Sequence, residues 1–413
     1  MRLFLDNYKG FVDTIISIKD VNFLVGENSS GKTSVLKLLE VISSPRFWFQ
    51  PEFNFEDIEL GYFSEIVNRN NKKDNSFRIG IDFDVKESSG FIHKFFWLEF
   101  VERNSKPIVH KFKFTSAEKS ILCIFESETR VVYFQKDFEQ DEDFYNWVHD
   151  IKTFENLEKS DVALHYNVPF AAVWSMVENK INSDNINRIY VPIPFNRVQR
   201  FAPIRATPKR WYESYAISYN SNGEHTPLLL KELLHSSKSK SLIAKLEYFG
   251  KESGLFDSIE VSDIIKDYPF ELRVKYGRLS MNLTNVGYGV SQVLPLIVEL
   301  LISKNQTFAI EQPEVHLHPR AQAAFGSFIH DIVTKNKNRL IIETHSDFLI
   351  NRFRYMVSKS HKRINAQILY FIRNGQGTHV YELPINNKGV LSGDKLSDYM
   401  TFFMDEELKM LEI

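Results

Sequence analysis

A glycine-rich octapeptide near the N-terminus constrains the fold of this chain more than any other feature. Residues 26–33 read Gly-Glu-Asn-Ser-Ser-Gly-Lys-Thr; an apolar run precedes them, and helically spaced apolar residues follow, namely Val35, Leu38, Leu39 and Ile42. Only glycine lets a backbone approach a phosphate closely with the dihedral angles that such a loop needs. The order strand, glycine loop, helix therefore predicts a phosphate-binding P-loop within an α/β fold.

The residue types in this loop predict a nucleotide site with a magnesium ion. The helix that follows directs a partial positive charge of about half a unit at the phosphates. Lys32 is expected to reach the β- and γ-phosphates, and Thr33 is expected to bind Mg²⁺. The predicted nucleotide contacts are Gly26, Asn28, Ser29, Ser30, Gly31, Lys32, Thr33 and Ser34.

The composition is that of an ordinary folded protein. Of 413 residues, 43% are hydrophobic and 25% are charged. The formal net charge is −2, so any DNA contact would have to be local or be made by a partner. Cys123 is the single cysteine, which excludes an intrachain disulfide and a cysteine-based zinc cluster. The N-terminus lacks the apolar core of a signal peptide, and the apolar run 293–302 is too short to span a membrane. We expect a cytoplasmic protein without a membrane partner.

The hydrophobic patterns divide the chain into segments of different character. Residues 1–136 are predicted to form an N-terminal lobe with the P-loop and a subdomain of antiparallel strands. Residues 137–185 predict a mostly helical insertion. Residues 186–413 predict a C-terminal lobe in which strands alternate with helices, with a lid-like helical segment at about 227–267 and a hairpin near the end. The expected fold class is α/β, with an antiparallel β-lobe, a central mixed or parallel sheet and helical insertions.

An acidic motif follows a buried strand in this second lobe. The apolar run 308–310 ends in Glu311, whose carboxylate fits the Mg²⁺-binding role of a Walker B strand. From this motif alone, an ordinary acidic residue at a strand end remains the alternative.

The residues around Glu311 carry a resemblance to a known family. Residues 310–319, Ile-Glu-Gln-Pro-Glu-Val-His-Leu-His-Pro, resemble the Walker B region of ABC-type P-loop ATPases of the SMC and OLD (overcoming lysogenization defect) branch. Residues 286–295 resemble the signature motif of that branch, and residues 342–346 resemble its switch-histidine segment. Residues 202–206 with Tyr212 resemble another recurrent segment. The resemblance covers most of the chain in the right order and is weakest between about 45 and 185.

This resemblance implies an ATPase whose site is completed by a second copy. In such ATPases two heads bind ATP with Mg²⁺ head to tail, so a dimer or larger homo-oligomer is expected. By motif, Ser291 and the backbone of Gly289 would contact the γ-phosphate of the partner's nucleotide, and His345 would sense the γ-phosphate in its own subunit. From the residues alone, Ser291 could instead be an ordinary N-cap of a helix. His345 could likewise be a histidine at a strand end whose hydrogen bonds are all made within the fold.

Gln312 departs from the pattern of the family. The catalytic set implied by the resemblance is Lys32, Glu311, Gln312 and His345, but the position of Gln312 usually holds an acid that polarises the attacking water. An amide cannot accept that proton, although a glutamine orients water in some GTPases. Slow hydrolysis is therefore expected. The metal-contacting glutamine loop of the family is not assigned.

The resemblance also implies a biological role, for which several hypotheses stay open. OLD nucleases and the Gabija ATPase carry a Toprim nuclease after the head, and this sequence is expected to leave no room for one. The first hypothesis is a nucleotide-dependent sensor or regulator of a separate nuclease or toxin in anti-phage defence, as in the Septu and PARIS systems. The second is a DNA-binding repair or chromosome head of the SMC type, which usually has long coiled coils. A scaffold that scarcely hydrolyses ATP is third, and a transporter subunit is least favoured.

Two further clusters have alternative interpretations. Basic and aromatic residues are mixed between 197 and 212, which could provide a nucleic-acid contact or an ordinary solvated or interface surface; they are Arg197, Arg200, Phe201, Arg205, Lys209, Arg210, Trp211 and Tyr212. Glu314, His316 and His318 have a spacing that suggests zinc. Without a further ligand, a loop at the dimer interface is the favoured interpretation.

Overall fold

The computed structural model describes residues 1–411 except 56–57, 70–73, 88–89, 117, 140–141, 166–167, 183–196, 214–217 and 264–268. The chain forms two compact units, each discontinuous along the sequence. The first unit comprises Met1–Ile18, Glu27–Arg197 and Phe371–Val380. The second comprises Lys19–Gly26, Val198–Tyr370 and Tyr381–Ile413.

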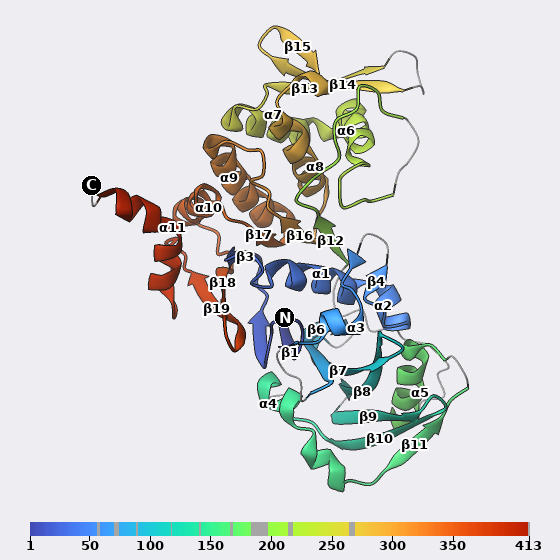
Figure 1. Ribbon diagram of the computed structural model, residues 1–413. Coiled ribbons are helices and arrows are strands. Elements are labelled where there is room, and N and C mark those ends of the chain that lie inside the picture. The colour runs from blue at the N-terminus through green and yellow to red at the C-terminus, as the bar shows by residue number, and fades with distance from the viewer. Residues whose placement is uncertain are drawn as a thin grey trace. The chain divides into compact units, whose positions relative to one another are not determined.

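The first unit is built on an antiparallel sheet, as the sequence predicted. Eight strands follow the order β11-β10-β9-β8-β7-β6-β1-β2 (Figure 1). Aromatic and β-branched residues dominate these segments, which favours strands. The strands are β1 (Arg2–Asp6), β2 (Thr14–Ser17), β6 (Ser76–Glu87), β7 (Gly90–Arg103), β8 (Lys106–Ser116), β9 (Lys119–Ser127), β10 (Arg130–Asp137) and β11 (Ser160–Ala163).

Short helices cover parts of this sheet. Trp147 of α4 (Phe144–His149) packs with Phe4, Phe95 and Trp97 in one aromatic core. The predicted helical insertion contains α4, η1 (Lys152–Asn156), α5 (Phe170–Asn182) and also strand β11, while its residues 183–185 lie outside the described residues. The remaining elements of this unit are α1 (Lys32–Ser43), α2 (Pro45–Phe49), β4 (Asn54–Phe55), β5 (Ile58–Glu59) and α3 (Phe63–Ile66).

A six-stranded sheet forms the centre of the second unit, except that residues Phe371–Val380 of its last two strands belong to the first unit. Its order is β12-β16-β17-β3-β18-β19, and the first four strands run parallel to one another. Every residue of β3 and β16 is buried, as expected for parallel strands covered on both faces. The strands are β3 (Val21–Gly26), β12 (Val198–Phe201), β16 (Thr307–Glu311), β17 (Arg339–Glu343), β18 (Ala366–Asn374) and β19 (Gly377–Ile385). The last two form the predicted hairpin.

Helices and a small sheet complete the second unit. Helix α8 (Tyr288–Ile302) is buried along nearly its whole length, which explains its almost entirely apolar sequence. Helix α9 (Pro319–Asn336) packs against α7 (Lys240–Ser253) and α10 (Asp347–Lys359) (Figure 1). The lid-like segment contains α6 (Thr226–His235), η2 (Ser237–Ser239) and α7, but from residue 258 it pairs as a strand. The other elements are β13 (Ser258–Asp263), β14 (Phe270–Tyr276), β15 (Leu279–Asn282), η3 (Leu283–Asn285) and α11 (Leu396–Leu411).

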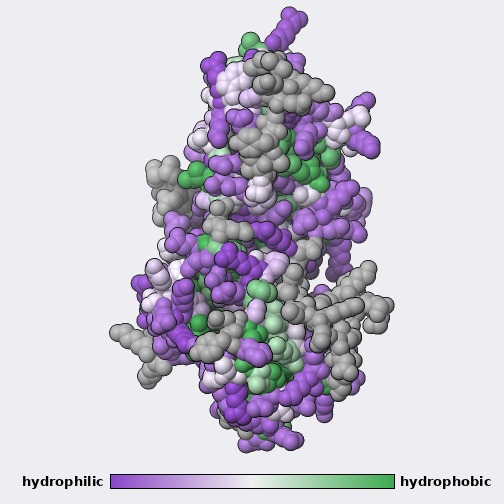
Figure 2. Space-filling model, turned by 90° about the vertical axis from the view of Figure 1, so that its right-hand side faces the viewer, coloured by the Kyte–Doolittle hydropathy of each residue, from purple (hydrophilic) through white to green (hydrophobic). Residues whose placement is uncertain are grey.

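The surface is mainly hydrophilic on the face that Figure 2 shows, with hydrophobic side chains in small groups. The most exposed large hydrophobic residues among those described, Tyr248, Ile204, Leu279 and Tyr62, lie far apart in the sequence. Within the described residues, no helix combines the length and apolar character that a membrane span requires.

Candidate functional site

The P-loop has the backbone conformation that phosphate binding requires. Strand β3 ends at Gly26, and α1 begins at Lys32. Gly26, Ser29 and Gly31 have positive φ angles of 147°, 61° and 97°. Glycine reaches these angles without steric cost, and Ser29 adopts them within an otherwise determined loop. The loop therefore turns its backbone between the strand and the amino end of the helix, where anions bind.

The side chain of Lys32 is folded against this loop. It is 3% exposed, and its Nζ donates to the Glu27 carbonyl oxygen at 2.7 Å and to Ser30 Oγ at 3.5 Å. Phosphate oxygens would take the place of these acceptors, because an ammonium group prefers an anionic partner. Gly31 packs so closely on the Phe11 ring that a Cβ atom would lie 2.7 Å from it, so this position is restricted to glycine.

Acidic residues meet at the carboxyl end of the parallel sheet. Strand β16 ends at Glu311, which pairs in register with Glu343 of β17. Glu343 in turn pairs with Leu24 of β3, the strand that leads into the P-loop. Ligands of open α/β sheets bind outside the carboxyl ends of the strands. The predicted Walker B residue thus lies at the correct sheet edge.

Two buried arginines bind Glu311. Nη1 of Arg200 donates to Glu311 Oε1 at 2.9 Å, and the two side chains are 6% and 8% exposed. Nη2 of Arg205 donates to the Glu311 backbone oxygen at 2.9 Å. Burial lowers the pKa of Arg205 to about 10, while the charges of Glu314 and Glu311 oppose this shift. The negative charge of Glu311 is therefore paired with the positive charge of Arg200 in this conformation.

Gln312 occupies a strained position directly after Glu311. Its φ angle is 41°, and its backbone N–H donates to the Glu343 carbonyl oxygen at 2.8 Å. A non-glycine residue rarely adopts such an angle unless the surroundings impose it. The bond to β17 thus fixes the turn that follows the Walker B strand.

Glu314 holds the segment that contains the predicted switch histidine. Its Oε1 accepts the backbone N–H of His345 at 2.7 Å, and its Oε2 accepts the Thr344 hydroxyl at 2.8 Å. Burial raises the pKa of Glu314, although these bonds and Arg205 oppose the shift. Ser346 caps α10 by accepting the Leu349 N–H. His345 is thus anchored through its backbone.

The predicted signature region, residues 286–295, includes the first turns of α8. Gly289 lies so close to the turn after β16 that a Cβ atom would be 2.7 Å from the His316 carbonyl oxygen. The His316 ring packs edge-on against Tyr288 at a centroid distance of 5.0 Å. The candidate zinc residues Glu314 and His316 therefore have other contacts. Ser291 is 6% exposed, and its hydroxyl donates to the Tyr288 carbonyl oxygen at 2.8 Å.

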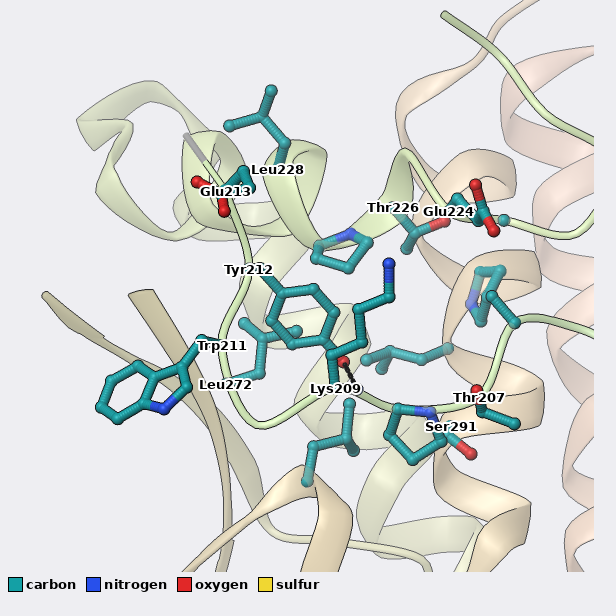
Figure 3. A pocket seen from close by; sticks show the side chains of 17 residues that line it. Thr207, Lys209, Trp211, Tyr212, Glu213, Glu224, Thr226, Leu228, Leu272 and Ser291 are labelled. Atoms are coloured by element: carbon teal, nitrogen blue, oxygen red, sulfur yellow. Dashed lines mark hydrogen bonds between the residues drawn. The ribbon is translucent and has the colours of Figure 1, made fainter. Parts of the chain in front are cut away.

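A cavity of about 300 Å³ lies beside Ser291. Its walls come from the segment after Arg205, the start of α6 and the first turns of α8. Figure 3 shows the Tyr212 ring and the Lys209 side chain within the cavity, whereas Trp211 points away from its centre. The Lys209 backbone N–H donates to the Tyr212 hydroxyl at 3.0 Å. Ser291 thus lines one wall of this cavity.

The basic and aromatic cluster does not form one exposed surface. Arg200 and Arg205 are 5% and 1% exposed because they bind Glu311. The exposed members of the cluster are Arg197, Lys209, Arg210 and Trp211. The two buried arginines are consequently not available for the nucleic-acid contact that was one of the two interpretations of this cluster.

Arg200, Arg205 and Glu314 were not predicted from the sequence to belong to this site. Arg200 interrupts a strand whose neighbours Val198 and Phe201 are buried, and a charge inside a buried strand demands a partner. An arginine within an apolar strand was therefore the sequence signal for a buried partner of opposite charge. The identity of the partners depends on contacts between residues more than one hundred positions apart, which local patterns do not contain.

The P-loop conformation and the parallel sheet define a P-loop nucleotide-binding protein. More specifically, the chain belongs to the AAA ATPase domain family, which matches residues 1–350. This match confirms the predicted resemblance to P-loop ATPases. No curated protein matches the chain.

Similar solved structures are heads of SMC proteins. The SMC head domain from Thermotoga maritima is 11% identical, with 92% of this chain and 98% of that chain covered and a TM-score of 0.41. An SMC head bound to the C-winged helix domain of ScpA is 11% identical, with 93% and 97% covered and a TM-score of 0.43. An SMC head with an extended coiled coil, bound to the C-terminal domain of ScpA derived from Pyrococcus furiosus, is 10% identical, with 98% of both chains covered and a TM-score of 0.39. At these values the likeness carries no conclusion about function.

Proposed function

We propose that this chain binds Mg²⁺-ATP and hydrolyses it slowly as a nucleotide-dependent switch. The observation that carries the proposal is the P-loop, with three positive φ angles and Lys32 folded against its own backbone. Lys32 and the loop N–H groups hold the phosphates in this proposal. Thr33 and Glu311 are the candidate metal ligands. Bound Mg²⁺ would supply charge neutralisation between the β- and γ-phosphates.

Two features of the Walker B region support slow turnover. Gln312 orients water but does not accept its proton. Glu311 bonds to Arg200, so a metal has to compete with a guanidinium group for this carboxylate. The same two features favour the second candidate function, a nucleotide-bound scaffold that scarcely hydrolyses ATP.

The proposed active form is a head-to-tail dimer or larger homo-oligomer. The backbone of Gly289 and the Ser291 hydroxyl would contact the nucleotide of the partner subunit, and His345 would sense the γ-phosphate of its own. Tyr288, at the start of the same helix, is 38% exposed, which supports access to this turn. Ser291 itself would have to exchange its bond to Tyr288 for a phosphate oxygen.

The proposed role is control of a separate effector, a nuclease or toxin, in cytoplasmic anti-phage defence. This proposal rests on the resemblance to the OLD branch. The exposed Arg197, Lys209, Arg210 and Trp211 are the remaining candidates for a DNA contact. Salt-dependent DNA binding by the isolated chain would favour the repair or chromosome role instead.

Turnover of Mg²⁺-ATP by three proteins tests the central proposal. We expect slow hydrolysis by the wild type, loss of about 100-fold or more in Lys32→Ala because the phosphates lose their cation, and a gain of about 10-fold or more in Gln312→Glu because a proton acceptor returns. Phosphate release measures all three. Wild-type turnover equal to that of Lys32→Ala, with ATP still bound, would reject the enzyme in favour of the scaffold.

A further inference from the structure

The turn after β16 connects two parts of the site through buried and half-buried polar groups. Gln312 and His316 both have positive φ angles, of 41° and 66°, so the turn is held in a conformation that the isolated peptide would avoid. Such strain persists only where surrounding contacts determine the backbone. Contacts from opposite sides of the turn are made by Arg205 and by the segment 344–346.

On one side, Arg205 joins the turn to the signature helix. Its backbone N–H donates to Gln292 Oε1 at 2.9 Å, and Gln292 Nε2 donates back to the Arg205 carbonyl oxygen at 3.3 Å. The guanidinium group of Arg205 donates to the Glu311 backbone oxygen. Gln292 follows Ser291 directly and is 1% exposed. Arg205 therefore links the α8 start to the end of β16, beside the direct packing of Gly289 and Tyr288 on His316.

On the other side, Glu314 joins the turn to the switch segment. Both of its carboxylate oxygens are used, one by the His345 N–H and one by the Thr344 hydroxyl. Thr344 is completely buried, and its backbone N–H donates to Leu24 of β3 at 3.2 Å. The carboxylate thus binds a segment that is itself attached to the strand leading into the P-loop.

The charges of Arg205 and Glu314 stabilise each other. Arg205 is 1% exposed, and the negative charges that favour its ionised form are those of Glu314 and Glu311. Glu314 is stabilised in return by the charge of Arg205 and by its two hydrogen bonds. Each of the two charges therefore favours the ionised form of the other. We call Gln292, Arg205, Glu311, Glu314 and Thr344 the polar bridge.

We propose that Arg205 and Glu314 are positioning residues that hold the signature helix and the switch segment in one arrangement about the Walker B turn. This inference rests on the proposed ATP hydrolysis. Glu314 acts by fixing the backbone of His345, and Arg205 acts by fixing the start of α8. A misplacement of about 1 Å at such groups costs about 100-fold in rate, even where the nucleotide still binds.

The decisive variant is Glu314→Gln, because glutamine keeps the shape but offers one acceptor where two are needed. We expect kcat to fall about 10-fold or more, with the dissociation constant for ATP nearly unchanged. Amide hydrogen exchange at residues 343–346 should become faster. Thr344→Ser, which keeps the hydroxyl, should retain turnover, whereas Thr344→Val, which keeps the volume, should lose it.

Glu252→Gln is the matched control. Glu252 also accepts two bonds, from Ser327 at 3.2 Å and Arg352 at 3.3 Å, but it joins α7 to α9 and α10. This variant should leave kcat and the exchange of residues 343–346 unchanged. Gln292→Leu tests the other end of the polar bridge. If both residues act through one unit, the fold-loss of kcat in the double variant should be smaller than the product of the two single losses.

The outcomes separate this inference from the proposed function. Wild-type turnover that does not depend on Lys32 would refute the proposed ATPase activity. In that case, amide hydrogen exchange at residues 343–346 in Glu314→Gln would still show whether Glu314 holds this segment. Lys32-dependent turnover that is equal in wild type and Glu314→Gln would refute only the positioning role. An equal loss in Glu252→Gln would also refute it, since the effect would be general destabilisation.

Discussion

At the residue scale, Lys113 illustrates how burial changes an ordinary side chain. It is completely buried in the antiparallel lobe, where its Nζ donates to the backbone oxygens of Trp147 and Asp150 and lies 4.3 Å from the centre of the Trp147 ring. Burial lowers the pKa of Lys113 to about 7. An exposed lysine titrates near pH ~10.4. The protein therefore carries a titratable group that penalises folding at neutral pH.

The sign of the resulting pH dependence follows from proton counts. Between about pH 7 and pH 10 the unfolded chain binds more protons at Lys113 than the folded chain, so stability rises with pH, by at most about 1.4 kcal/mol per unit. Below about pH 7 both states are protonated, and this contribution is constant. We expect Lys113→Met to remove the rise. Urea midpoints measured between about pH 7 and pH 9 test this.

Lys119→Met provides the control for this experiment. Lys119 is 42% exposed and pairs with Asp137, so its replacement should preserve the pH dependence of the wild type. An identical pH dependence in wild type and Lys113→Met would show that Lys113 is charged throughout this range.

At the element scale, the start of α8 is shaped by its contact with the turn after β16. Alanine favours a helix over glycine by about 1 kcal/mol, but a Cβ atom at Gly289 would lie 2.7 Å from the His316 carbonyl oxygen. The clash involves backbone, which cannot rotate away. We expect Gly289→Ala to destabilise the protein by about 1–3 kcal/mol and to lower ATP turnover.

Gly287→Ala is the appropriate comparison. Gly287 caps the same helix at a φ of −57°, and a Cβ atom there would meet nothing within 4 Å. Thermal unfolding of both variants distinguishes the contact from a general effect of alanine. Equal melting temperatures for the two variants would contradict the proposed steric restriction.

At the scale of the whole molecule, the proposed ATP-dependent association is open to direct measurement. We expect wild type to double its mass on adding ATP and Mg²⁺, as measured by light scattering. Gly287→Glu should prevent the increase without blocking ATP binding, because it places bulk and negative charge at the exposed start of the signature helix. Gly375→Glu, at a hairpin position that is equally open, should associate normally. Association of Gly287→Glu like that of the wild type would rule out this turn as the interface.

Much of the fold was predictable because its signals are local. The antiparallel strands of the first unit, the buried strands β16 and β17 and the hairpin of β18 and β19 all follow from periodicity and turn residues within a few positions. The strand β13 was missed within a helical interpretation because its residues acquire their structure by pairing with β14.

By itself, the sequence determined the P-loop, since contiguous residues between one strand and one helix build the phosphate-binding backbone. Gly26 and Gly31 occupy positive φ angles that their own residue type permits. Only the tertiary structure decided the roles of Arg200, Arg205 and Glu314. Their neighbours in sequence suggest a basic surface and a metal ligand. Folding instead buries the two arginines against Glu311 and bonds the half-buried Glu314 to residues 344 and 345, so each role depends on partners from distant segments.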